Sequence, residues 1–144
     1  MICISVLFLH AGLPSEMFYK KGDNVMEDIR QQQIDVLKEA VPYCEKMIGA
    51  IEKVSDELAG ECFPETHDAV NVIIEGLNWL FEVYNGTRTL INEDGKSIDE
   101  KSVNEAVKDL SDAVSDNDDM ALSKALVRLA EFVKELREAG SRYI

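Results

Sequence analysis

The residues of this sequence that could bind a metal ion or attack a substrate are few. Its histidines are His10 and His67, and its cysteines are Cys3, Cys44 and Cys62. Cys62 and His67 stand close together near the expected start of a helix, and thiolate and imidazole are ligands that Zn²⁺ prefers. A structural zinc site needs four ligands, and the sequence offers no other two beside them. We therefore interpret Cys62 and His67 as a surface pair, and we expect neither a metal nor a cofactor.

The residue spacing also excludes other metal and catalytic sites that are common in helical proteins. A di-iron bundle needs Glu-x-x-His pairs, but Pro64 occupies the position three before His67. The acidic run at residues 116–119 lacks the glycine and terminal glutamate of an EF-hand loop, so we interpret it as a helix cap. Neither Cys44 nor Cys62 has an evident base partner in the sequence, and Cys44 falls on an apolar face as a core thiol. No catalytic residue is predicted.

One class of enzyme stays open as an alternative. All-α nucleotide pyrophosphohydrolases of the MazG type are acidic helical bundles that bind magnesium through clustered carboxylates. The run Glu65-Thr-His-Asp68 resembles part of their E-x-x-D pattern, but the paired-glutamate motif that precedes it is missing. The alternative hypothesis is therefore a metal-dependent nucleotide hydrolase or ligand-binding bundle. Its carboxylates would lie on one helix: Glu65, Asp68, Glu75 and Glu82.

Length, composition and charge narrow the remaining classes. A chain of 144 residues with 46% hydrophobic residues is an ordinary size for one domain with a real core. Its net charge of −13 opposes binding to nucleic-acid phosphates or to an anionic membrane, and favours basic or apolar protein partners. Three cysteines without CxxC spacing indicate reduced thiols and a cytoplasmic protein.

The first 25 residues differ from the rest. Residues 2–13 are a short apolar run, but no Lys or Arg precedes it and no convincing cleavage site follows, so a signal peptide is disfavoured. Residues 20–23, Lys-Lys-Gly-Asp, are what a ribosome-binding sequence would encode in this frame, just before Met26. We expect an irregular extension at 1–25, with the natural start suspected at Met26, followed by one helical domain at 26–144.

The stretch at residues 65–92 is the most apolar long segment and is expected to form a central helix. Apolar residues at steps of three and four predict one buried face: Val70, Ile73, Leu77, Leu80, Tyr84, Thr87 and Ile91. A second apolar face lies roughly opposite: Val72, Trp79, Val83 and Leu90. A column of asparagines between the faces is interpreted as the wet edge: Asn71, Asn78, Asn85 and Asn92. Two neighbours in the same chain explain both faces, and a partner on the second face is the alternative.

Three further helices complete the predicted fold. The first runs from Met26 to about Ala59, with a kink or a break at Pro42. Ser97 and Glu100 form an S-x-x-E capping box for a third helix ending near residue 115, and the fourth continues to Gly140. Short connections make neighbouring helices antiparallel. We therefore predict an all-α, antiparallel up-down four-helix bundle with its first helix kinked near Pro42.

The predicted lengths suggest where a partner would bind. The first two helices are longer than the last two, so their hairpin should overhang near residues 59–64 and expose apolar side chains, including Val70. Together with the second face of the central helix, the predicted partner surface is Val72, Trp79, Val83, Leu90, Ile51, Val54, Leu58 and Phe63.

Several runs carry a family resemblance. Residues 74–80 (IEGLNWL), residues 103–110 (VNEAVKDL) and Asn117-Asp118 followed by leucines resemble a family of small, acidic, uncharacterised helical-bundle proteins of Gram-positive bacteria. In outline the predicted bundle is also similar to flagellin-specific export chaperones, which cover an apolar helix of their client. We therefore expect a non-enzymatic adaptor or chaperone-like protein that buries an apolar segment of a protein partner or of its own dimer mate.

Overall fold

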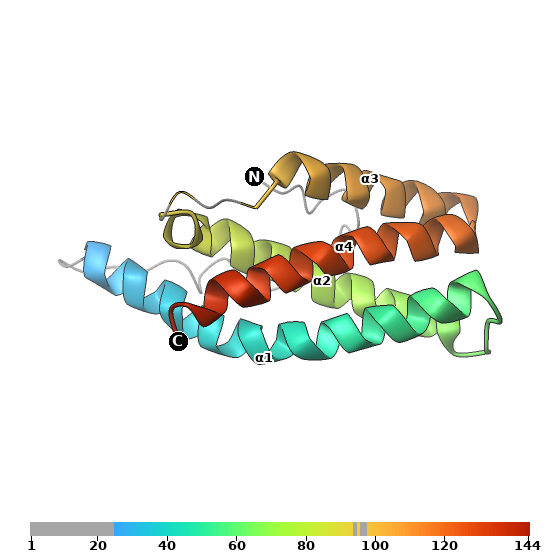
Figure 1. The fold of residues 1–144 in the computed structure, drawn as a ribbon, viewed down its shortest axis with the longest axis horizontal. Helices are drawn as coiled ribbons and strands as arrows, with labels where there is room; N and C mark the ends of the chain where they lie inside the picture. Colours follow the sequence, from blue (N-terminus) through green and yellow to red (C-terminus); the bar gives the residue numbers. More distant parts are fainter. Residues whose placement is uncertain (1–24, 94, 96–97) are drawn as a thin grey trace.

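The computed structural model describes residues 25–93, 95 and 98–144, and it shows an all-α four-helix bundle within that part of the chain (Figure 1). The helices are α1 (Val25–Ala59), α2 (Thr66–Ile91), α3 (Glu100–Asp116) and α4 (Asp119–Ser141). The predicted fold class is therefore confirmed. The expectations for the segment before Met26 fall on residues 1–24, which lie outside the described residues.

The helix boundaries follow local chemistry, with two departures from prediction. Asp118 caps α4 through a 3.1 Å hydrogen bond that its carboxylate accepts from the amide of Ala121, as expected for the acidic run. For α3 the predicted capping box is wrong, because the helix begins at Glu100 and Asp99 is the N-cap, accepting from the amide of Ser102. The alternative of a break at Pro42 is also wrong, since α1 continues through it as one helix; the kink stays a prediction.

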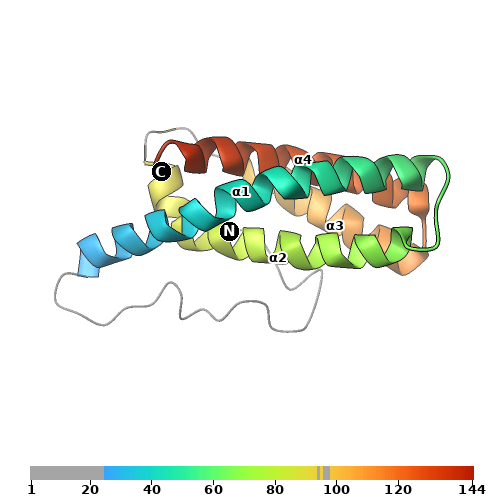
Figure 2. The same ribbon diagram turned by 90° about the horizontal axis from the view of Figure 1, so that it is seen from below.

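The long helix α1 lies between α2 and α4 and packs most extensively against α4 (Figure 2). The hydroxyl of Ser123 in α4 donates to the carbonyl of Ser55 in α1 at 2.8 Å, and both residues are buried. Some fourteen residues earlier in α1, Val41 lies against Gly140 near the end of α4. Contacts that pair early residues of one helix with late residues of the other mean that α1 and α4 run in opposite directions.

The interface between α1 and α2 has the same directional order but larger side chains. The Gln33 side-chain amide donates to the carbonyl of Gly86 at 2.9 Å, whereas Thr66, at the start of α2, donates to Glu57 near the end of α1. Between these points, Tyr43 and Met47 of α1 fill the space above the missing side chain of Gly76. The second apolar face of α2 is thus covered mainly by α1.

The predicted exposure of apolar side chains at the corner, residues 60–65, is wrong for most of them, although Phe63 and Val72 are exposed as expected. Ile51, Val54, Leu58 and Val70 are all buried. The cause is the position at which α3 begins, which is beside the last turns of α2 rather than beyond its end. Glu100 lies beside the last two turns of α2, where it accepts hydrogen bonds from Tyr84 and Arg88, and the 17 residues of α3 reach back to the corner. Figure 2 shows the α3–α4 turn at the same end of the bundle as the α1–α2 connection.

Candidate functional site

An aromatic pair occupies the seam between α1 and α2. The rings of Tyr43 and Trp79 meet edge to face with centroids 5.2 Å apart, and both residues are partly buried against the core. Burial, together with the nearby Cys44 and Glu75, raises the pKa of Tyr43. Val72 lies seven residues before Trp79, hence on nearly the same line of α2, and it is 66% exposed. We refer to Tyr43, Val72 and Trp79 as the aromatic seam.

Some residues of the predicted partner surface are buried in the core, and others are exposed. Five of the eight residues are buried inside the chain: Val83, Leu90, Ile51, Val54 and Leu58. Val72 and Phe63 are exposed, and Trp79 is partly buried beneath Tyr43. Only Val72, Phe63 and the outer part of Trp79 are therefore available to another molecule in this conformation.

The seam contains an unpaired donor. Among the described residues, the buried indole Nε1 of Trp79 and the buried side-chain oxygen of Asn78 have no hydrogen-bond partner. Asn78 was expected at the wet edge of α2, and its burial corrects that part of the interpretation. A buried polar atom without a partner costs free energy, which a partner or a solvent molecule with a suitable group would recover.

A second cluster forms at the corner. The Sγ atom of Cys62, a ring nitrogen of His67 and a carboxylate oxygen of Asp119 all lie within 4.8 Å of one another. Cys62 Sγ is 3.6 Å from Asp119 Oδ2, and His67 Nε2 is 2.8 Å from Asp119 Oδ1. We refer to Cys62, His67 and Asp119 as the corner cluster; it joins the α1–α2 connection to the first residues of α2 and α4.

A buried hydroxyl holds the connection that carries Cys62. Thr66 is fully buried; its Oγ1 donates to Glu57 Oε1 at 2.7 Å and accepts from the amide of Phe63 at 2.8 Å. The same segment is anchored to α1 because the Cys62 thiol also lies 3.6 Å from the carbonyl of Glu57. The two ends of the connection are thereby fixed, which places Cys62 and His67 on the same side of the corner.

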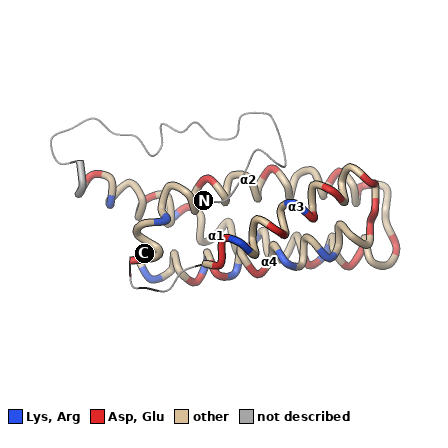
Figure 3. Tube along the Cα trace, turned by 90° about the horizontal axis from the view of Figure 1, so that it is seen from above, with Lys and Arg blue, Asp and Glu red and all other residues tan. Residues whose placement is uncertain are grey.

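The charge around the corner cluster is strongly negative. Lys and Arg are absent from residues 54–87 and from residues 109–123, the two stretches that meet there. Figure 3 shows acidic residues predominating at this end, whereas basic residues lie along α4 and toward the other end. Burial and the Asp119 carboxylate raise the pKa of the Cys62 thiol, while the hydrogen bond from His67 lowers the pKa of Asp119.

The sequence pointed to Cys62 and His67 but missed Asp119. The missing signal was topological: in an up-down bundle the second and fourth helices begin at the same end, so an acidic start of α4 falls beside the start of α2. Asp119 belongs to the run that was interpreted only as a cap, whereas Asp118 alone accepts the capping hydrogen bond. The side chain of Asp119 is therefore not needed to cap α4.

The carboxylates of the alternative enzyme hypothesis are not brought together. Glu65, Asp68 and Glu75 are exposed and Glu82 is partly buried. Within the described part of the chain, the corner cluster is the only group of three or more potential ligands close enough to share an ion. Cys44 is fully buried, and burial raises its pKa to about 12, which disfavours the thiolate that a nucleophile requires.

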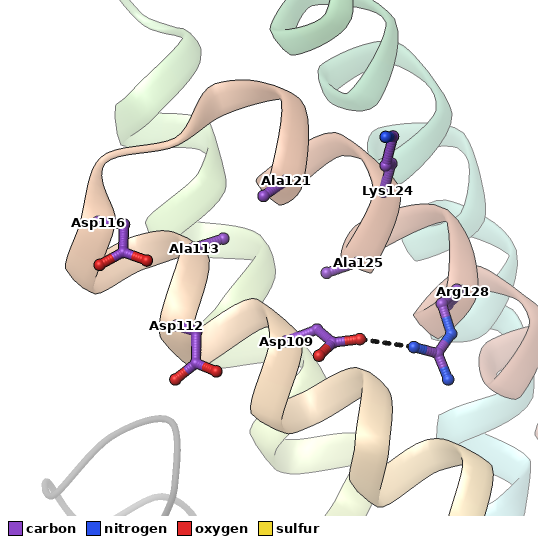
Figure 4. A pocket seen from close by; sticks show the side chains of 8 residues that line it. All are labelled: Asp109, Asp112, Ala113, Asp116, Ala121, Lys124, Ala125 and Arg128. Atoms are coloured by element: carbon purple, nitrogen blue, oxygen red, sulfur yellow. Dashed lines mark hydrogen bonds and ion pairs between the residues drawn. The ribbon is translucent and has the colours of Figure 1, made fainter.

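A hollow of about 260 Å³ lies between α3 and α4 (Figure 4). Its floor is made of Ala113, Ala121 and Ala125, and its rim carries carboxylates of α3 opposite basic groups of α4. Arg128 and Asp109 close one side with a 2.6 Å ion pair. Because small apolar side chains form the floor and Arg128 is already paired with Asp109, we assign no chemistry to this hollow.

Comparison with known families gives one match. The family model described as "Domain of unknown function (DUF8042)" matches residues 35–139, which span α1 from Asp35 onward, α2, α3 and nearly all of α4. No protein of curated function and no solved structure is significantly similar to the chain. Within the described residues, none of the helices combines the length and apolar character that a bilayer crossing requires. The family model covers well over half of the sequence, and the chain therefore belongs to the DUF8042 family.

Proposed function

We propose that this protein is a non-enzymatic, helical-bundle interaction protein that buries an apolar segment of a protein partner or of its own dimer mate. Val72 carries the proposal. It is a β-branched apolar side chain, 66% exposed, aligned along α2 with the partly buried Trp79. Isolated exposed valines are ordinary, but one that continues an aromatic pair gives a partner both apolar area and a large ring to pack against.

The surroundings of the seam favour a partner with basic and apolar character. Glu75 is exposed on α2 between Val72 and Trp79, and no Lys or Arg occurs between residues 54 and 87. An amphipathic helix with apolar residues on one face and lysines on its flanks would match both features. In outline, the bundle predicted from the sequence is similar to flagellin-specific export chaperones, and that resemblance implies the same kind of partner, a client helix.

Paired valine variants test the proposal. Val72→Asp puts a charge on the seam, and Val127→Asp is the matched control, since Val127 on α4 is also exposed, at 51%. Self-association is measured by light scattering, and partner capture by pull-down from the native lysate followed by mass determination of what is retained. We expect the bound species, whether a second copy or another protein, to be retained by Val127→Asp and lost from Val72→Asp.

Two results would contradict the proposal. One is a protein that stays monomeric and retains nothing from its native lysate. The other is a partner that binds both variants equally, which would move the interaction away from the aromatic seam.

A further inference from the structure

The corner cluster goes beyond the proposed interaction function, because it combines three kinds of ligand atom in one place. A thiol comes from the α1–α2 connection, an imidazole from the first turn of α2 and a carboxylate from the first residue of α4. Sulfur and imidazole nitrogen select zinc over magnesium or calcium, which prefer sites made of oxygen atoms alone. We propose that Cys62, His67 and Asp119 bind a Zn²⁺ ion with a water molecule in the fourth position.

The distances suit this coordination. With Zn–S near 2.3 Å and Zn–N or Zn–O near 2.0–2.2 Å, ligand atoms of a tetrahedral site lie roughly 3.3–3.6 Å apart. Cys62 Sγ is already 3.6 Å from Asp119 Oδ2, while the 2.8 Å contact of His67 with Asp119 Oδ1 is a hydrogen bond that a bound ion would replace. All three side chains are at least partly exposed, so rotation about side-chain bonds is enough to adjust them.

The local charge provides an independent reason for a cation. No Lys or Arg from either converging stretch offsets the carboxylates at this end, so a positive ion would relieve their repulsion. Binding converts the Cys62 thiol to a thiolate, with its proton released to solvent, and turns the lone pair of His67 Nε2 toward the ion. No oxidation or reduction takes place.

The proposed ion would also connect elements that the chain does not connect directly. Cys62 and Asp119 are 57 positions apart in sequence, and a shared ion would tie the α1–α2 connection to the start of α4. Thr66 already fixes the connection through Glu57 and Phe63, so the backbone that carries Cys62 is held in place before the ion arrives.

Cobalt substitution tests the site on the full chain. Metal-free protein is titrated with Co²⁺, which reports a cysteine ligand through a sulfur-to-metal charge-transfer band, and Zn²⁺ affinity is measured by competition with a chromophoric chelator. We expect one equivalent to bind with that band. Cys62→Ser should abolish the band, and His67→Ala and Asp119→Asn should each weaken Zn²⁺ binding by at least about 10–100-fold, the loss typical of outer-shell partners alone.

Matched controls separate this site from other ligands in the chain. Cys3→Ser removes another thiol, and Asp116→Asn removes an exposed carboxylate of the same acidic end without touching the cluster. Both should bind Co²⁺ and Zn²⁺ like the natural sequence, and circular dichroism should show that all variants keep their helices. The proposal is overturned by a titration without the charge-transfer band, by a band that Cys3→Ser loses and Cys62→Ser keeps, or by equal Zn²⁺ affinity in all variants.

Discussion

Helix α1 has two seams, and they are built differently. Against α4 it is closed by small residues: Gly140 admits Val41 and Leu37, and Ser123 reaches the backbone of Ser55. Against α2 it is filled by the long side chains of Tyr43 and Met47, which lie over Gly76 and leave Val72 uncovered. A seam of small residues leaves no room for another chain, whereas a seam of large rings stays partly accessible. The first therefore serves stability, and the second is where recognition is expected.

Truncation of the α4 seam should give the largest effect. Leu37 is fully buried and lies next to Gly140, so Leu37→Ala should lower the free energy of unfolding by about 2–5 kcal/mol, the cost of a core cavity. Val72→Ala, on the other seam, should stay within about 0.5 kcal/mol of the natural sequence. Urea denaturation of both variants measures the contrast. Similar losses would mean that the two seams are equally structural.

Replacing Gly140 and Gly76 by alanine tests the same difference between the two seams, with smaller expected effects on stability. A Cβ at Gly140 would stand 2.9 Å from Val41 Cγ2, and a valine in a helix has little rotamer freedom with which to move away. Gly140→Ala should therefore cost roughly 1–3 kcal/mol of overpacking, reduced by the better helix propensity of alanine.

At Gly76 the new Cβ would meet the far ends of Met47 and Tyr43, which can rotate aside. Gly76→Ala should therefore change stability less than Gly140→Ala does, yet shift the fluorescence of the neighbouring Trp79. Thermal denaturation ranks the two variants, and fluorescence checks the seam. An unchanged Trp79 spectrum would show that Tyr43 has not moved.

The contact between α2 and α3 depends on charge, so the effect of breaking it should vary with pH. Burial alone would raise the pKa of Glu100, but its hydrogen bonds, including those from Tyr84 and Arg88, lower it from 4.5 to about 2. A carboxylate with a lowered pKa stabilises the fold fully above pH 4.5 and loses that contribution as the pH falls toward 2.

The measurement compares urea denaturation of the natural sequence and Glu100→Gln at about pH 6 and about pH 3. The variant should be less stable at the higher pH, and the difference should shrink at the lower one. A difference that does not depend on pH would assign the role of Glu100 to packing rather than to charge.

Much of the fold was predictable, because apolar spacing within each helix is a local signal. The four helices, the dual faces of α2 and the cap run before α4 all follow from it. The burial of Ile51, Val54, Leu58 and Val70 was missed because the position of α3 depends on the contacts of Glu100 with Tyr84 and Arg88, which a sequence does not show. Asp119 was missed for a related reason: its neighbours Cys62 and His67 are more than 50 positions away.

The predicted partner surface was also only partly recognisable from the sequence. Periodicity correctly placed Val72 and Trp79 on one line of α2 but could not tell which helix covers that line. Tyr43 of α1 packs edge to face against Trp79, which is partly buried, whereas Val72 on the same line is 66% exposed. Exposure is set by one side chain of a neighbouring helix, and no pattern within α2 encodes it.

The stretch without Lys or Arg between residues 54 and 87 also has a kinetic consequence. An uncompensated negative surface speeds the diffusional encounter of a positively charged molecule before any contact forms. That acceleration falls as salt shortens the reach of the field, to about 8 Å at physiological ionic strength. A basic partner should thus arrive faster at low salt, while its rate of departure, set by apolar contacts at the seam, should change little.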